Sequence, residues 1–264
     1  MTHLYRCVYH HIVGSEETVK TRRMFNTITR ISSGISGEGL EMKGSDIDIM
    51  LVLKDVNVYE DINSTHINSS ETCVAMEMGD TKLGFSHLPL LRCNNNILFK
   101  MRKEVENDLY LSSQLCKSMF IGQFKGGDVV HGPCLSDKDR VADLAITLHS
   151  RKWISIAKQW ITRSNCSWPS SEVKSQIQDH GIMCVPIGSK ESQHEDIELR
   201  ILFSVGEKPL IYSFTHTQLL CYALMKILIK DVVNRDSRCK DLICSCYIKN
   251  IIVWVSEEIP LSIW

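Results

Sequence analysis

Two apolar runs constrain this chain most: residues 46–53 (DIDIMLVL) carry two acidic residues near their beginning, and residues 141–148 (VADLAITL) carry one. Runs of this length that are rich in Val, Ile and Leu are typical of strands in a buried sheet. A carboxylate inside such a run needs a partner, because an isolated charge in an apolar setting is costly. Asp143 therefore either pairs with an Arg or Lys of the core or contributes to a metal site.

The remaining pattern predicts mixed strands and helices first and helices alone at the end, which indicates an α+β fold. Thr215 and Gln218 are spaced as a capping box ahead of an apolar stripe at helical spacing. Ser15 is placed to cap an amphipathic helix over 16–31. We expect residues 56–72 to form an exposed loop. The other expected elements are a strand at 199–204, helices at 150–163 and 241–255, and a helix beginning at 168–171.

Composition excludes several classes of protein. The chain has 264 residues, and its 30 Lys and Arg against 31 Asp and Glu exclude a globally basic nucleic-acid binder. No apolar run reaches the roughly 18 residues of a membrane span, so we expect no membrane partner, and the first residues do not resemble a secretory signal. The 11 Cys include no C-x-x-C pair, which argues against a zinc site and favours reduced thiols. We expect a cytoplasmic protein, with the nucleus as the alternative.

The acidic residues of the first run have the spacing of a metal site. Asp46 and Asp48 are two apart in a strand, so their side chains project from the same face. Adjacent carboxylates repel each other unless a cation lies between them, and Mg²⁺ prefers oxygen ligands. Just upstream, the turn Gly34–Gly39 could offer backbone N–H groups to a triphosphate. With Asp143 as a third carboxylate, this set suits two-metal catalysis.

A series of motifs occurs in a characteristic order over about residues 16–262. They are GISGEGL (34–40), SDIDIMLVL (45–53), HGPCLSD (131–137), VADLAITL (141–148), KWISIAKQWITR (152–163), WPS (168–170), LRILFSVGEK (199–208), HTQLLCYALMKILIK (216–230) and CSCYIK (244–249). In this order the set resembles the Mab-twenty-one family and the cyclic GMP-AMP synthase-like receptors of the nucleotidyltransferase superfamily.

The resemblance implies a nucleotidyltransferase mixed sheet with a spine helix, at residues 1–208, and a helical lobe of HhH/H2TH-like type at 209–264. It implies synthesis of a cyclic dinucleotide from ATP and GTP, of the kind made by innate-immune sensors, with Mg²⁺ or Mn²⁺. Asp46, Asp48 and Asp143 match the family's metal-binding carboxylates. The positions that match its nucleotide-binding residues, or lie next to them, are Gly34, Ser36, Ser204, Glu207, Lys226 and Ser245.

The sequence departs from the family pattern at three points, and the first of them supports a rival hypothesis. Ile35 stands where the family has the Ser of its phosphate loop, which removes a hydroxyl that would reach the triphosphate. The stretch 209–220 holds His216 but no Cys, so we expect no zinc thumb. The helical lobe ends early, which suggests truncation. Ile35 favours a catalytically inactive Mab-twenty-one-like domain that binds a nucleotide or serves as a protein scaffold, whereas the intact acidic set favours an enzyme.

Basic residues suggest a nucleic-acid surface. Lys20, Arg23 and Arg30 would lie along one flank of the helix expected at 16–31. Lys152, Lys158 and Arg163 add charge on the next expected basic helix. Contacts to phosphates need such clusters, although scattered basic residues are more often only solvated. A double-stranded nucleic-acid activator is therefore a hypothesis, without a choice between RNA and DNA.

Overall fold

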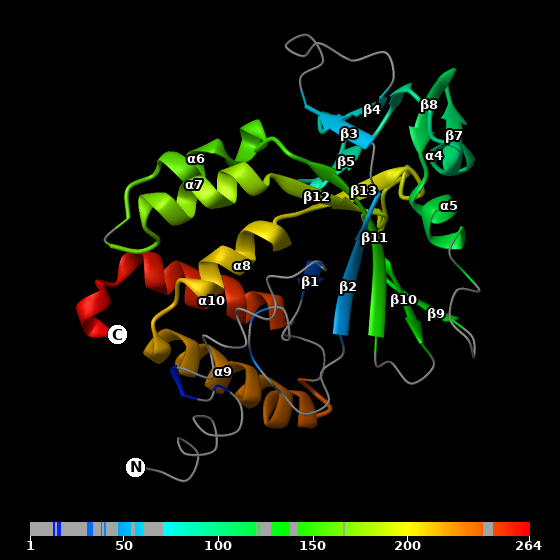
Figure 1. The fold of residues 1–264 in the computed structure, drawn as a ribbon. Helices are drawn as coiled ribbons and strands as arrows, with labels where there is room; N and C mark the ends of the chain where they lie inside the picture. The colour runs from blue at the N-terminus through cyan, green and yellow to red at the C-terminus, as the bar shows by residue number, and fades with distance from the viewer. Residues whose placement is uncertain are drawn as a thin grey trace.

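A computed structural model describes residues 13, 15–16, 31–33, 38, 40, 47–53, 56–60, 71–119, 121, 128–137, 142–165, 167–239 and 245–264. These residues form a mixed α+β structure, as expected. One large sheet is covered by small sheets and short helices near one end and by a group of longer helices along its side (Figure 1).

The large sheet is built around one parallel pair. Strand β2 (Ile47–Val52) runs parallel to β11 (Ala142–Ser150), whereas all other pairings in this sheet of described strands are antiparallel. The order is β1 (Ile31–Ser33), β2, β11, β12 (Ile182–Val185), β13 (Glu198–Leu202) and β5 (Phe85–His87), with β10 (Cys134–Asp137) on β11 and β9 (Asp128–His131) on β10.

Strand β11 is long enough to pair with two antiparallel strands, β10 and β12. Its first half pairs with β10, through Asp143 to Ala145, and its last residues, Leu148 to Ser150, pair with β12. Strand β2 pairs along residues 142–147 of β11. The pairing therefore places the beginnings of β2, β11 and the β9–β10 hairpin at one end of the sheet.

A second group of strands and short helices covers the other end. Its core combines Leu148, Ile182 and Leu199 of the large sheet with Val56 and Val58. The elements of this group are β3 (Val56–Tyr59), β4 (Thr72–Ala75), β6 (Leu90–Arg92), α4 (Asn96–Lys100), β7 (Arg102–Val105), β8 (Asp108–Leu111) and α5 (Ser113–Ser118).

The longer helices share a second core. Ile177, Ile211, Tyr222 and Ile252, one from each of four helices, pack together there and are almost fully buried. The helical elements are η2 (Ser155–Ala157), α6 (Lys158–Thr162), α7 (Ser171–His180), α8 (Ser204–Tyr212), α9 (His216–Asp231), η3 (Val233–Arg235), α10 (Ser245–Glu258) and η4 (Leu261–Ile263). In the described part of the chain, none of these helices combines the length and the apolar character that a membrane crossing requires.

Several expectations from the sequence are confirmed. The two acidic apolar runs form β2 and β11, and the run near 199 forms β13. Helix α7 begins after Ser170, whose hydroxyl accepts a hydrogen bond from the Val173 N–H. The helix expected from 241 is α10, which begins at Ser245 in the described residues.

Four local expectations were wrong. Residues 56–59 form a strand rather than a loop, because Val56 and Val58 alternate with polar residues and bury one face. Ser150 ends β11, and helical structure in 150–163 is confined to 155–162. Ser204 opens α8 instead of closing a strand. Residues 17–30 and 61–70 lie outside the described part, and Ile31, expected at a helix end, belongs to β1.

The boundary expected after residue 208 falls inside α8 (Ser204–Tyr212). This helix continues from the end of β13 into the helical core, because Leu210 and Ile211 are buried there. The division into 1–208 and 209–264 remains a prediction.

The capping box of α9 is formed as expected. The Thr215 hydroxyl accepts from the Gln218 N–H at 3.2 Å, and the Gln218 side chain accepts from the Thr215 N–H at 2.7 Å. Because the first N–H groups of a helix have no partner within it, these two bonds fix where α9 begins.

We expect Thr215→Ala to lower the free energy of unfolding by about 1 kcal/mol, because the cap is lost. Urea denaturation measures the change. Thr217→Ala is the matched control, since Thr217 is exposed in the same turn of α9, and it should stay within about 0.5 kcal/mol of the unchanged protein. Equal losses in both variants would contradict the capping argument.

Candidate functional site

Two of the three predicted carboxylates lie side by side. Asp48 of β2 is directly opposite Asp143 of β11 in the parallel register. Neighbouring strands lie about 4.8 Å apart and paired residues share a face, so both side chains project from the same face. Asp143 is only 9% exposed. Asp46, the third predicted carboxylate, lies outside the described residues.

Each of these two aspartates also has a serine opposite it on a second neighbouring strand. Ser33 is opposite Asp48 in the pairing of β1 with β2, and Ser136 is opposite Asp143 in the pairing of β10 with β11. Ser136 is buried. We call this register of Ser33, Asp48, Asp143 and Ser136 the polar row. It crosses β2 and β11 near the beginning of both strands.

The acidic pair faces the helices. The Ser204 hydroxyl contacts the Met50 sulfur at 3.6 Å, and Met50 lies two residues after Asp48 on the same face of β2. Asp48 is also close enough to the Lys226 ammonium to favour its charged form. Figure 1 shows α8, α9 and α10 on the side of the sheet where β1 and β2 lie. The site is thus formed between the sheet and the helical core.

A buried cluster of charged side chains joins these helices, and its centre is Glu38. One oxygen of Glu38, Oε2, accepts from the Tyr222 hydroxyl at 2.8 Å and from Lys226 Nζ at 3.1 Å. The other, Oε1, lies 3.0 Å from Lys249 Nζ. Lys249 also donates to Glu207 Oε2 at 2.7 Å. Glu38 and Lys226 are only 5% and 6% exposed.

The pKa values in this cluster follow from burial and pairing. Burial raises the pKa of Glu38, but Lys249, Lys226 and the hydrogen bonds outweigh it and hold the pKa below 4.5. Burial opposes the charge of Lys249, yet Glu38 and Glu207 raise its pKa. For Lys226 burial prevails and lowers the pKa, although Glu38 and Asp48 act against it. Burial and the Glu38 charge together raise the pKa of Tyr222.

The structure brings some of the predicted nucleotide-binding residues together. Glu207 and Lys226 belong to one cluster, linked through Glu38 and Lys249. Ser204 contacts β2 two residues from Asp48. Ser245 opens α10, one turn before Lys249. Gly34 and Ser36 lie outside the described residues.

Three members of the cluster were missed in the sequence. Glu38 stands between two glycines, and Tyr222 and Lys249 stand among apolar helix residues. Lys226 was the residue that could have indicated this cluster from the sequence, because a Lys within an apolar stripe requires a buried partner of opposite charge. Nothing in the spacing of residues 38, 226 and 249 shows that they meet.

The donor set suits a hard divalent cation. Asp48 and Asp143 offer carboxylate oxygens, which are the ligands that Mg²⁺ and Mn²⁺ prefer. The described residues contain no group of three or more His, Cys, Asp and Glu side chains arranged to hold a metal ion. Among the described residues of the site and the cluster, the carboxyl groups of Asp48, Asp143, Glu38 and Glu207 accompany the ammonium groups of Lys226 and Lys249.

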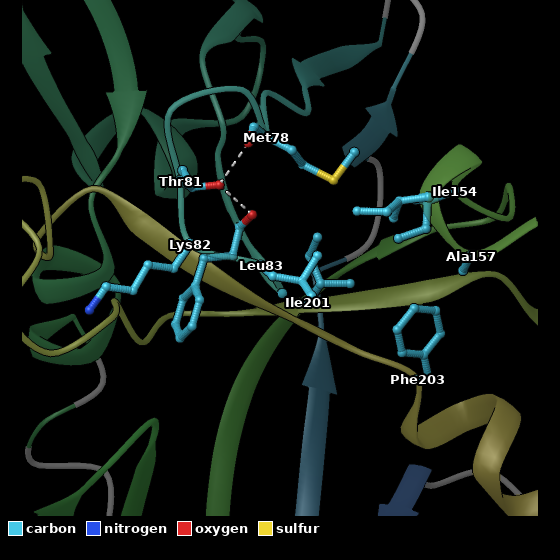
Figure 2. A pocket seen from close by; sticks show the side chains of 11 residues that line it. Met78, Thr81, Lys82, Leu83, Ile154, Ala157, Ile201 and Phe203 are labelled. Atoms are coloured by element: carbon cyan, nitrogen blue, oxygen red, sulfur yellow. Dashed lines mark hydrogen bonds between the residues drawn. The ribbon is translucent and has the colours of Figure 1, made fainter.

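Two cavities lie away from the acidic pair. The larger, of about 450 Å³, is apolar, and Figure 2 shows Met78 and Thr81 on one side of it and Ile154, Ala157 and Phe203 on the other. The Thr81 hydroxyl is bound to the Met78 and Phe85 carbonyl oxygens and so offers little to a ligand. The smaller, of about 210 Å³, is lined by acidic residues, His87, His194 and Tyr110. Neither contains Asp48, Asp143 or Lys226, so we base the candidate site on the chemistry of the polar row.

Comparison with the models of known protein families found no match, and a search of curated proteins found no relative.

We expect Glu38→Gln to lower the free energy of unfolding at neutral pH by roughly 3 kcal/mol, because the buried Lys226 ammonium group loses its carboxylate partner and Lys249 keeps only Glu207. Since the pKa of Glu38 is below 4.5 in the folded chain, its contribution is complete above that pH and is lost as the pH falls through the folded pKa. The difference between the two proteins should therefore shrink in acid.

Urea denaturation at a series of pH values measures this difference. The exposed Glu104 provides the matched control, and Glu104→Gln should leave stability nearly unchanged at each pH. A Glu38→Gln deficit that stays constant down to the lowest pH would contradict the charged state assigned to Glu38.

Proposed function

We propose that this chain is a metal-dependent nucleotidyltransferase that joins nucleoside triphosphates, ATP and GTP, into a cyclic dinucleotide. The observation that carries the proposal is the register of β2 and β11, which puts Asp48 and Asp143 side by side on a face that meets the helices. The proposal also rests on the resemblance of the ordered motifs to the Mab-twenty-one family and the cyclic GMP-AMP synthase-like receptors, and it includes the nucleotidyltransferase fold.

The acidic residues would bind the metal ion from different positions on the two strands. Asp48 and Asp143, together with Asp46, would hold Mg²⁺ or Mn²⁺ through their carboxylate oxygens. The bound cation would favour the ionised form of an attacking ribose hydroxyl and offset the negative charge of the phosphates. Asp143 lies in a more buried position than Asp48, where little water competes for its oxygens.

The helical wall would orient the nucleotide. Lys226 would attract a phosphate oxygen, as the family resemblance implies, from a buried position in which Glu38 holds it at 3.1 Å. Glu207 is fixed by Lys249 at 2.7 Å, and Ser204 lies at the start of the same helix. Gly34 and Ser36 would bind the triphosphate, as the family resemblance implies.

An activating ligand is part of the hypothesis. Lys152 and Lys158 are exposed, whereas Arg163 is paired with the buried Glu257. Exposed basic residues suit a double-stranded nucleic acid, whose phosphates they would neutralise. The assay must therefore include duplex RNA and duplex DNA.

The rival is an inactive domain of the same fold that binds a nucleotide or a protein. Ile35 favours it, because the side chain lacks the hydroxyl of the family's phosphate loop. The closeness of Asp48 and Asp143 opposes it, since two adjacent carboxylates repel each other, and a cation bound between them would offset that repulsion. Nucleotide binding without any product, under every activator, would support the rival.

We expect Asp143→Asn to reduce formation of the cyclic product by at least about 100-fold, because one metal-binding carboxylate is lost. The unfolding midpoint measured without divalent metal should stay the same or rise, since the repulsion with Asp48 is removed. Product is measured with ATP, GTP, Mn²⁺ and each duplex. Asp179→Asn, at an exposed position on α7, should leave both values unchanged. A large loss of stability in Asp143→Asn would instead indicate a structural ion pair.

We expect Ile35→Ser to raise the rate of product formation several-fold, because it supplies a hydroxyl that can reach the triphosphate. The rate is compared with that of the unchanged chain at saturating ATP and GTP. An equal or lower rate would contradict the role given to residue 35 and would leave the acidic pair to be judged by Asp143→Asn alone.

A further inference from the structure

The smaller cavity, of about 210 Å³, lies where three segments of the chain meet. One wall comes from the segment between β4 and β5 and from β5 itself, through Asp80 and His87. The β7–β8 hairpin forms the second wall, through residues 105–110, and the turn before β13 forms the third, through His194 and Ile197. Sites for drug-sized ligands measure roughly 300–1,000 Å³, so this pocket suits a group of the size of one amino-acid side chain.

Backbone hydrogen bonds hold the three walls together. His87 exchanges two bonds with Glu77, its N–H donating at 2.9 Å and its carbonyl oxygen accepting at 3.0 Å. The Leu111 N–H of β8 donates at 3.0 Å to the carbonyl oxygen of the residue that follows His87, and the Ser113 N–H donates at 2.8 Å to Asp196 in the turn before β13. The pocket is therefore preformed, and a ligand would not need to order its walls on binding.

His87 is the residue of the pocket whose polar atoms are least satisfied. Its ring centroid lies 5.9 Å from that of Tyr110 and 5.9 Å from that of His194, both edge-on. Its Nε2 is buried and has no hydrogen-bond partner among the described residues. Burial lowers the pKa of His87 in spite of nearby carboxylates, so the ring is neutral at pH 7 and one of its nitrogens can accept a hydrogen bond. A ligand with an N–H group would supply the missing partner.

The charge of the pocket is negative. Apart from the two histidines, its titratable lining residues are Tyr110 and three exposed acids, Asp80, Glu106 and Asp108. No described Lys or Arg lines it, and Lys103, which is opposite Tyr110 in the hairpin, is paired with Asp196. Burial and the neighbouring carboxylates raise the pKa of Tyr110, so its hydroxyl stays neutral. Carboxylates around an aromatic ring attract a cation.

We propose that this pocket binds an organic cation, an alkylguanidinium or alkylammonium group, between the Tyr110 ring, the exposed carboxylates and His87 Nε2. A metal ion suits it less, because the described residues contain no three His, Cys, Asp or Glu side chains arranged around one point. The same group occurs on free small amines and on the basic side chains of peptides. The site is separate from the acidic pair and does not depend on the proposed function.

Titration of the full 264-residue chain with butylguanidinium and butylammonium tests this, with affinity from calorimetry and nitrogen-15 NMR of the histidine rings. We expect saturable binding that shifts the His87 and His194 signals and leaves that of His149 unchanged, since His149 Nε2 is already bonded to a carbonyl oxygen at 2.7 Å. Butylurea, an uncharged analogue of the same shape, should bind at least about tenfold more weakly. Equal binding of butylurea, or no binding of either cation, overturns the proposal.

Variants of the exposed carboxylates locate the bound cation. Asp80→Asn and Asp108→Asn, on different walls, should each weaken butylguanidinium binding about threefold or more, and together about tenfold or more. Glu104→Gln is the matched control, because Glu104 is an exposed acid of the same hairpin that does not line the pocket. It should change the affinity less than about 1.5-fold. An equal loss in Glu104→Gln would show a general effect of surface charge and would overturn the assignment.

Two further probes decide the source of the cation and exclude a metal. A capped alanine–arginine–alanine tripeptide that binds about tenfold more tightly than butylguanidinium would assign the pocket to a basic side chain of a peptide. An equal or lower affinity of the tripeptide would assign it to a free small cation, and both results keep the shared chemistry. Binding of Zn²⁺ with shifts of both histidines, while neither organic cation binds, would make the pocket a metal site and overturn the proposal.

Discussion

The parallel pairing of β2 with β11 is the constraint on which the site depends. These strands are far apart in sequence, and their register alone brings Asp48 and Asp143 together. A shift by one residue would turn one of the two carboxylates to the opposite face of the sheet, because side chains alternate along a strand. The antiparallel partners on either side hold this register, since β1 pairs with β2 while β10 and β12 pair with β11.

The buried charges between sheet and helices form the second layer of the arrangement. Glu38, Glu207, Lys226 and Lys249 come from four separate segments, yet each has a partner of opposite charge within about hydrogen-bonding distance. Burial makes the pair of Glu38 and Lys226 costly as well as stabilising, because both charges have lost most of their water, whereas Glu207 stays partly exposed. The cluster therefore joins α8, α9 and α10 through Glu38, and it places charged groups near Asp48.

Much of the local structure could be predicted, for identifiable reasons. The Thr215–Gln218 capping box and the cap at Ser170 depend only on neighbouring residues, and both were found where expected. Residues 56–59 were mistaken for a loop, because polar residues surround a short strand whose burial comes from distant residues. In the site, Asp48 and Asp143 could be chosen because acids in apolar strands are unusual. Glu38 and Lys249 could not, because each looks ordinary until its partner is known.

The sequence by itself determined three of the apolar strands, β2, β11 and β13, the helices that have local caps, and the few acidic residues that lie in apolar strands. Periodicity and capping act over a few residues, so they can be read directly from the chain. Only the tertiary structure decided that Asp48 and Asp143 share a face, and that Glu38 stands between two lysines of different helices. Those contacts join residues distant in sequence, and their energies depend on burial, which no local pattern specifies.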